Sequence, residues 1–195
     1  AWLPAITNDD VRIDIMANVG SVPEVQRALD IGAEGVGLLR TEFLFLDRTT
    51  PPDEEEQVTQ YRACADMLGD RPLVIRTLDI GGDKHVPYLA HLNESNPALG
   101  VRGIRLTHAW PDLLKTQLRA IWRSRVGCNI KVLFPMVTGI DEIRWLRQSL
   151  DEVASELRTP TPEHHTPIAT GIMIEVPSAA LQARQALALL DFLSI

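Results

Sequence analysis

The stretch "GVGLLRTEFLF" (residues 35–45) runs from an apolar segment directly into three polar residues, Arg40, Thr41 and Glu42. The apolar part lacks strict alternation with polar residues, which is typical of a parallel strand covered on both faces. An unpaired guanidinium in an apolar interior costs on the order of several kcal/mol. We therefore expect Arg40 at the end of a buried strand, where it meets either a counter-charge or an anionic ligand.

Five more segments, rich in Val, Ile and Leu, resemble this one: "VRIDIMANV" (11–19), "PLVIRTLD" (72–79), "IKVLFPM" (130–136), "ATGIMIEV" (169–176) and "DFLSI" (191–195). The intervals carry helical patterns. Five helices are expected, beginning near Ser21, Asp53, Pro111, Thr138 and Ser178. Ser21 with Glu24, and Asp53 with Glu56, have the spacing of capping boxes.

The alternation of strand and helix predicts right-handed crossovers and a parallel sheet. An open doubly wound sheet and a (β/α)₈ barrel that ends after its sixth strand both fit. A full barrel takes about 250 residues, so 195 residues leave about 60 for two more units. The first turn, "ANVGSVPE", lacks a G-x-G-x-x-G fingerprint. The expectation is an α/β fold: a partial TIM-barrel domain over residues 1–195, with about six strands and five helices, truncated at its C-terminus.

Composition excludes several classes of function. The formal net charge of −7 disfavours nucleic-acid binding, which needs clustered Lys and Arg. No run reaches the roughly 18 consecutive apolar residues of a membrane span, and no signal segment opens the chain. Two cysteines, Cys64 and Cys128, make no disulfide framework and favour a cytoplasmic location.

Charged residues collect where the strands of the expected sheet end, which is the active face of parallel α/β folds. They are Arg40, Arg76, Asp79, Lys84, Arg102 and Glu175. Guanidinium forks match carboxylates and phosphates, and a carboxylate at the same mouth requires an intervening cation such as Mg²⁺. The pattern therefore predicts a site for a phosphorylated carboxylic acid with Mg²⁺. The competing interpretation is structural, with each arginine in an ion pair, such as Arg40 with Glu42.

Five blocks carry a family resemblance: "GAEGVGLLRTEFLFLDR", "VIRTLDIGGDK", "NPALGVRGIRL", "LFPMVTGIDEIRWLR" and "GIMIEVPSAAL". They resemble the C-terminal phosphoenolpyruvate-binding barrel of enzyme I of the bacterial phosphoenolpyruvate:sugar phosphotransferase system, from about residue 14 to residue 195. Pyruvate phosphate dikinase and phosphoenolpyruvate synthase are more distantly similar. The "RTEFLF" and "DIGGDK" blocks favour enzyme I, or a multidomain multiphosphoryl transfer fusion of it.

The resemblance implies a role for each matching position. Arg40 matches an arginine that meets the phosphate of phosphoenolpyruvate, and Arg76 matches a second ligand of phosphate and carboxylate. Arg102 and Lys84 fall in blocks that line the same pocket. Glu175 matches one of two acidic Mg²⁺ ligands. The second acidic ligand, the cysteine that protonates the enolate and the phospho-accepting histidine have no counterpart in these residues, so no catalytic residue is expected in the fragment.

The implied activity is transfer of the phosphoryl group of phosphoenolpyruvate to a histidine and on to a histidine phosphocarrier protein for sugar uptake. The parent is expected to be a cytoplasmic homodimer with no membrane insertion, and the fragment to be inactive alone. Alternatives are a dikinase or synthase of the same type, a 2-oxo acid aldolase or lyase on a similar barrel, and a non-catalytic binding fragment. Two open sheet edges predict that the fragment associates.

Overall fold

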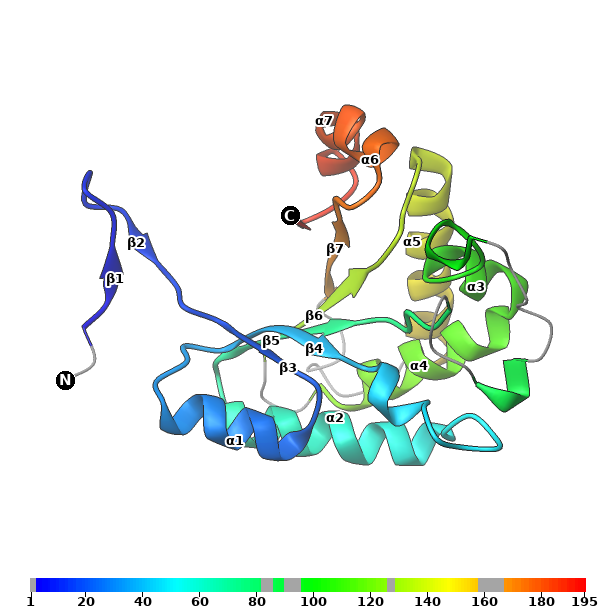
Figure 1. Cartoon of the computed structure of the whole chain (residues 1–195), viewed down its shortest axis with the longest axis horizontal. Coiled ribbons are helices and arrows are strands. Elements are labelled where there is room, and N and C mark those ends of the chain that lie inside the picture. Colours follow the sequence, from blue (N-terminus) through cyan, green and yellow to red (C-terminus); the bar gives the residue numbers. More distant parts are fainter. Residues whose placement is uncertain (1–2, 82–85, 90–95, 126–128, 158–166) are drawn as a thin grey trace.

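Six parallel strands form one sheet in the computed structural model, which describes residues 3–81, 86–89, 96–125, 129–157 and 167–195. They are β3 (Ala17–Val19), β4 (Val36–Arg40), β5 (Pro72–Arg76), β6 (Asn129–Phe134), β7 (Ala169–Met173) and β8 (Phe192–Ser194), in that order across the sheet. A doubly wound sheet reverses its strand order at a switch point. The unbroken order instead confirms the barrel alternative, and the sheet curls into a half-barrel (Figure 1).

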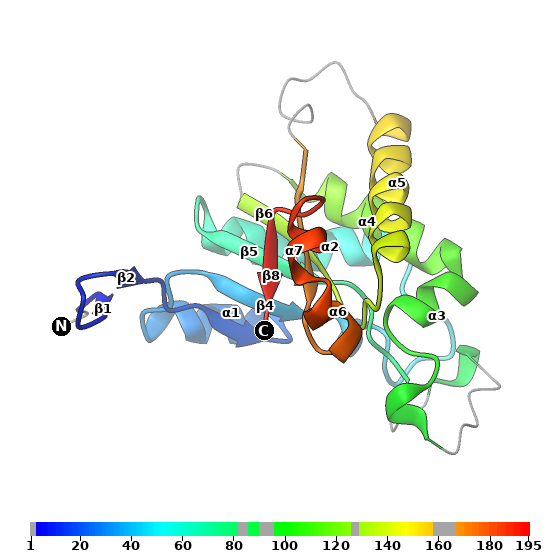
Figure 2. The same ribbon diagram turned by 90° about the horizontal axis from the view of Figure 1, so that it is seen from above.

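Helices cover the convex side of this sheet (Figures 1 and 2). They are α1 (Val22–Asp30), α2 (Glu54–Leu68), α3 (Ile104–Ala109), α4 (Pro111–Arg123), α5 (Ile140–Glu156), α6 (Pro177–Leu181) and α7 (Ala183–Leu187). Short 3₁₀ turns lie at η1 (Glu42–Leu44), η2 (Pro87–Leu89) and η3 (Pro97–Leu99). Within the part of the chain that the structure describes, no helix is long and apolar enough to cross a membrane.

The helices differ from expectation in two places. An additional helix, α3, precedes α4, and Trp110 separates the two with φ −130° and ψ 71°. This break has a local cause, because Pro111 disfavours helical dihedrals in the residue before it. The last expected helix is split into α6 and α7 at Gln182, whose side-chain amide donates to the carbonyl of Thr138.

The first expected strand, 11–19, is wrong in its first half. Only β3 joins the main sheet, whereas β2 (Arg12–Ile13) pairs antiparallel with β1 (Ala5–Ile6) in a hairpin that projects from the body (Figure 1). The turn between them is built by Thr7, whose backbone N–H donates to the carbonyl of Val11, and by Asp10 at φ 61°. Asp tolerates this left-handed conformation better than most residues.

The two expected capping boxes have different outcomes. At α2 the Asp53 side chain accepts from the Glu56 N–H at 2.8 Å, and the Glu56 carboxylate accepts from the Asp53 N–H at 2.9 Å. At α1 the Ser21 side chain makes no capping bond, and the Glu24 carboxylate accepts from the N–H of Gly20 instead. The first box is confirmed and the second is wrong.

The apolar core lies between the sheet and the helices, and this placement decides where the arginines point. Register pairs Ile75 with Val132, and both belong to the core under the helices. Side chains alternate between faces along a strand, so the neighbouring Arg76 and its register partner Leu133 face the concave side. The inside of the half-barrel therefore receives the strand-end arginines.

Candidate active site

Arg40 and Arg76 are the last residues of β4 and β5, and they are register partners in the parallel sheet. Register partners project from the same face, so both side chains enter the concave side at the carboxyl ends of the strands. This is the edge where ligands bind in parallel α/β folds. The structure thus brings together two of the arginines that the sequence places at this edge.

Arg76 is held between two acidic side chains. Its Nη2 lies 2.9 Å from Glu42 Oε1 and its Nη1 lies 3.5 Å from Asp79 Oδ2. Nη1 also contacts the sulfur of Met173 at 3.8 Å. The side chain of Glu42 is only 2% exposed, because the η1 turn folds it back under the strand ends. A charge this deeply buried is tolerated because it is paired, so Arg76 has a fixed orientation.

Arg102 lies next to Arg76 and shares its acidic partner. Arg102 Nε is 3.0 Å from Asp79 Oδ1, and Nη2 is 2.8 Å from Oδ2, which is a bidentate pair. Asp79 therefore bridges the two arginines, and Glu42 is at the far end of the same chain of charges. The sequence named Asp79 as a candidate at this mouth, and the structure gives it the role of a buried counter-ion.

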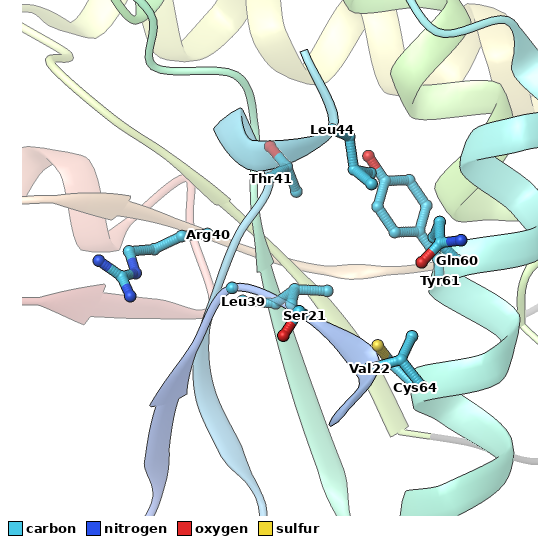
Figure 3. A pocket seen from close by; sticks show the side chains of 10 residues that line it. Ser21, Val22, Leu39, Arg40, Thr41, Leu44, Gln60, Tyr61 and Cys64 are labelled. Carbon is cyan, nitrogen blue, oxygen red and sulfur yellow. The ribbon is translucent and has the colours of Figure 1, made fainter. Parts of the chain in front are cut away.

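Arg40 differs from both. Among the described residues no carboxylate forms an ion pair with it, and its Nε is buried without a hydrogen-bond partner. Its guanidinium lies 5.2 Å from the centre of the Phe43 ring. The expected structural pair of Arg40 with Glu42 is wrong, because Glu42 binds Arg76 instead. Figure 3 shows the Arg40 side chain extending to the opposite side of its strand from Tyr61 and Cys64.

Glu175 follows β7 and is exposed. One of its oxygens, Oε1, accepts from the backbone N–H of Met136 at 2.7 Å. Met136 has a left-handed φ of 59°, and this turn directs its N–H toward the carboxylate. A Cβ built on Gly103 would lie 2.8 Å from the Met136 Cβ, so the loop that carries Arg102 packs against the residue that binds Glu175.

The acidic groups of the site offer few ligands to a divalent cation. Within the described ranges, no group of three or more His, Cys, Asp or Glu side chains could hold a metal ion. Glu175 offers a carboxylate of the type that Mg²⁺ prefers, and Mg²⁺ is commonly held by one or two carboxylates together with substrate phosphates. Glu175 is therefore compatible with Mg²⁺ only if oxygen atoms of a bound phosphorylated ligand complete the coordination shell.

Some sequence expectations fall outside the described residues. Lys84 is one of them, as is Cys128. Sequence reasoning missed Met136 and Gly103, since the left-handed conformations that bring them together have no pattern in an apolar stretch.

A curled parallel sheet with helices on its convex side, and with arginines at the carboxyl ends of two adjacent strands, defines a partial α/β barrel. The comparison with protein families makes this specific. The whole chain, residues 1–195, matches the family described as PEP-utilising enzyme, PEP-binding domain, and the chain belongs to this family.

Curated relatives agree with the assignment. The chain is 50% identical over 194 residues to a multiphosphoryl transfer protein of Xanthomonas campestris and 45% identical over 194 residues to that of Rhodobacter capsulatus. It is 42% identical over 190 residues to the phosphoenolpyruvate-protein phosphotransferase of Geobacillus stearothermophilus. These alignments cover 97% to 100% of the chain but only 22% to 33% of the relatives.

Proposed function

We propose that this domain binds phosphoenolpyruvate for a phosphoenolpyruvate-protein phosphotransferase. That enzyme would transfer the phosphoryl group to a histidine on another domain, and from there to a histidine phosphocarrier protein for sugar uptake. The observation that carries the proposal is the Arg40 guanidinium, which lies at the strand ends beside Arg76 with no acidic partner among the described residues. The family and the names of the relatives support the same assignment.

The arginines have different parts in this proposal. Arg40 binds the phosphate, because no carboxylate among the described residues forms an ion pair with it. Arg76 is fixed by Glu42 and Asp79, and the part of its guanidinium that these carboxylates do not cover faces the phosphate and carboxylate of the ligand. Phosphoryl transfer depends mainly on positioning and on stabilising charge that spreads over oxygen atoms as the bond to the leaving enolate breaks. Fixed guanidinium groups meet both needs.

Arg102 and Lys84 complete the proposed pocket. Arg102 is held bidentately by Asp79, so it would line the pocket and balance the charge that Asp79 introduces. Lys84 is assigned from the sequence block alone.

Glu175 is the proposed Mg²⁺ ligand of this chain. Its Oε1 accepts from the backbone N–H of Met136, which orients the carboxylate, and Oε2 would be the oxygen available to a cation. When bound, Mg²⁺ would supply positive charge between Glu175 and the phosphate and carboxylate oxygens of the ligand. The hydrogen bond from the Met136 N–H holds the Glu175 carboxylate in place, as hydrogen bonds to metal-binding side chains generally do.

The proposal includes a cytoplasmic location, a homodimeric full-length protein and a domain that extends over residues 1–195. The chain has only two cysteines in 195 residues, too few for a disulfide framework, and this supports a reducing compartment. The two outer strands, β3 and β8, each pair on one side only in the described sheet, as in a partial barrel.

Radiolabelled phosphoenolpyruvate tests this proposal with the full-length protein. With Mg²⁺ the protein should acquire an acid-labile, base-stable label, as phosphohistidine does, and pass it to an added phosphocarrier protein. A requirement for AMP and pyrophosphate would instead indicate a dikinase. The absence of any label transfer from phosphoenolpyruvate would contradict the proposal.

A further inference from the structure

Four polar side chains are fully buried beneath the candidate site. Thr41 and Gln57 are each 1% exposed, and Tyr61 and Gln117 are each 0% exposed. They come from the end of β4, from α2 and from α4. Buried polar groups are costly unless they are hydrogen-bonded, so a cluster of this kind requires a closed set of partners.

Gln117 is the centre of that set. Its Oε1 accepts from the backbone N–H of Leu78 at 2.8 Å. Its Nε2 donates to the Thr41 hydroxyl and to the Tyr61 hydroxyl, both at 3.0 Å. Both donor hydrogens and the acceptor of this side chain are therefore used.

The hydroxyl groups extend the network in two directions. The Thr41 hydroxyl donates to the carbonyl of Arg76 at 2.8 Å, and the Tyr61 hydroxyl donates to Gln57 Oε1 at 3.1 Å. Burial raises the pKa of Tyr61, so its hydroxyl remains a donor. One end of the network thus reaches the backbone of a site arginine, and the other end stays on helix α2.

The bonds around Gln117 connect the two strand ends that carry the site. Thr41 directly follows Arg40, while the Arg76 carbonyl and the Leu78 N–H belong to the end of the neighbouring strand and its loop. Arg40 and Arg76 are themselves register partners. A single side chain on α4 therefore ties both arginine backbones to the helix layer.

We infer that Gln117 is a positioning residue that fixes Arg40 and Arg76 relative to each other for binding the phosphate of the ligand, an inference that rests on the proposed function. An apolar residue could fill the same volume, but it could not bond to both strand ends. Fully satisfied buried networks specify one arrangement of the groups that they connect. Small displacements of binding groups cost a large part of the rate, up to about a hundredfold for about 1 Å.

Steady-state phosphotransfer by the full-length protein tests this inference. Gln117→Met keeps the shape of the side chain and removes its three hydrogen bonds. Ser124→Ala is the control, because this serine caps the C-terminal end of the same helix, is fully buried, and donates to the carbonyls of Ala120 at 2.7 Å and Val58 at 3.4 Å, both in the helix layer. Loss of folded protein lowers kcat but leaves KM unchanged, so KM for phosphoenolpyruvate is the discriminating measurement.

The expected result is a rise in KM of at least about threefold and a fall in kcat/KM of at least about tenfold for Gln117→Met, with KM unchanged in Ser124→Ala. Thr41→Val should raise KM in the same way. The rise in KM in the double variant should be less than the product of the two single effects, since both substitutions remove the same hydrogen bond between Gln117 and Thr41. Thr41→Val also serves alone if Gln117→Met does not fold. A KM within twofold of the wild type in the folded variant overturns the inference, whereas an inactive wild-type protein would overturn the proposed function instead.

Discussion

Arg40 and Arg76 are register partners at the ends of adjacent parallel strands, yet within the part of the chain that the structure describes only Arg76 is ion-paired, with Glu42 at 2.9 Å and Asp79 at 3.5 Å. Equivalent positions on adjacent strands thus place the two guanidinium groups in different electrostatic environments. One is fixed and largely neutralised, and the other retains its charge next to an aromatic ring. This asymmetry lets the domain hold a rigid frame and still present net positive charge to an anion.

Asp79→Asn should destabilise the protein, because Asp79 is buried and is the shared counter-ion of Arg76 and Arg102. Removing one member of a buried ion pair costs about 3 kcal/mol or more. For a domain of this size that corresponds to a fall in melting temperature of roughly 6 °C or more. Asp141→Asn is the control, since Asp141 pairs with Arg144 at the surface and its side chain is 96% exposed. Equal melting temperatures for the two variants would contradict the bridging role.

Glu175→Gln should weaken Mg²⁺ dependence without affecting stability. The amide oxygen can still accept from the Met136 N–H, so the local structure is preserved, but the negative charge is lost. The Mg²⁺ concentration for half-maximal phosphotransfer should rise about tenfold or more. Glu152→Gln, which removes a surface partner of Lys115, should leave it unchanged. An identical Mg²⁺ titration for Glu175→Gln and the wild type would remove Glu175 from the site.

Gly103→Ala should disturb the loop that carries Arg102. Gly103 has φ 51°, and an added Cβ would lie 2.8 Å from the Cβ of Met136. Gly69→Ala separates the two effects, because Gly69 has φ 57° but nothing within 4 Å of an added Cβ. Both variants should lose about 1 kcal/mol from backbone strain. Only Gly103→Ala should raise KM for phosphoenolpyruvate, and an equal KM in both variants would show that the packing of this loop does not affect the site.

The sequence predicted the parallel sheet because buried strands leave an apolar signature, and it placed Arg40 correctly because a charge after such a strand has few positions available. It could not predict the partner of Glu42. That carboxylate is closest in sequence to Arg40, but the η1 turn directs it to Arg76 on the next strand. The left-handed backbone conformation of Met136 also has no sequence pattern that could predict it, since packing between loops imposes it.

The N-terminal hairpin shows another limit of sequence patterns. Residues 11–19 read as one apolar strand, but the Ile15 N–H donates to the Glu34 carboxylate at 2.7 Å, outside the sheet ladder. This contact forms between positions far apart in the chain. Sequence periodicity reports only local order, so it indicates one continuous strand where the structure has two, β2 and β3.

The 195-residue chain expressed alone should associate. In the described sheet β3 and β8 are the outer strands, and each offers an unpaired edge to another molecule. Size-exclusion chromatography with light scattering should detect dimers or larger species. Calorimetry with Mg²⁺ should detect only weak binding of phosphoenolpyruvate, since the expected second acidic ligand is not in this chain. A monomer that binds phosphoenolpyruvate with micromolar affinity would show that these residues already contain the whole site.

We expect the charge of Arg40 at the strand ends to serve phosphoryl transfer from phosphoenolpyruvate. The most direct measurement is kcat/KM for this transfer in full-length Arg40→Ala, beside Arg144→Ala, which removes an arginine from an exposed surface pair. We predict a fall of at least about a hundredfold for Arg40→Ala, the scale of losing one preorganised charge-stabilising group, with an unchanged melting temperature and no effect in the control. Turnover by Arg40→Ala equal to that of the wild type would contradict it.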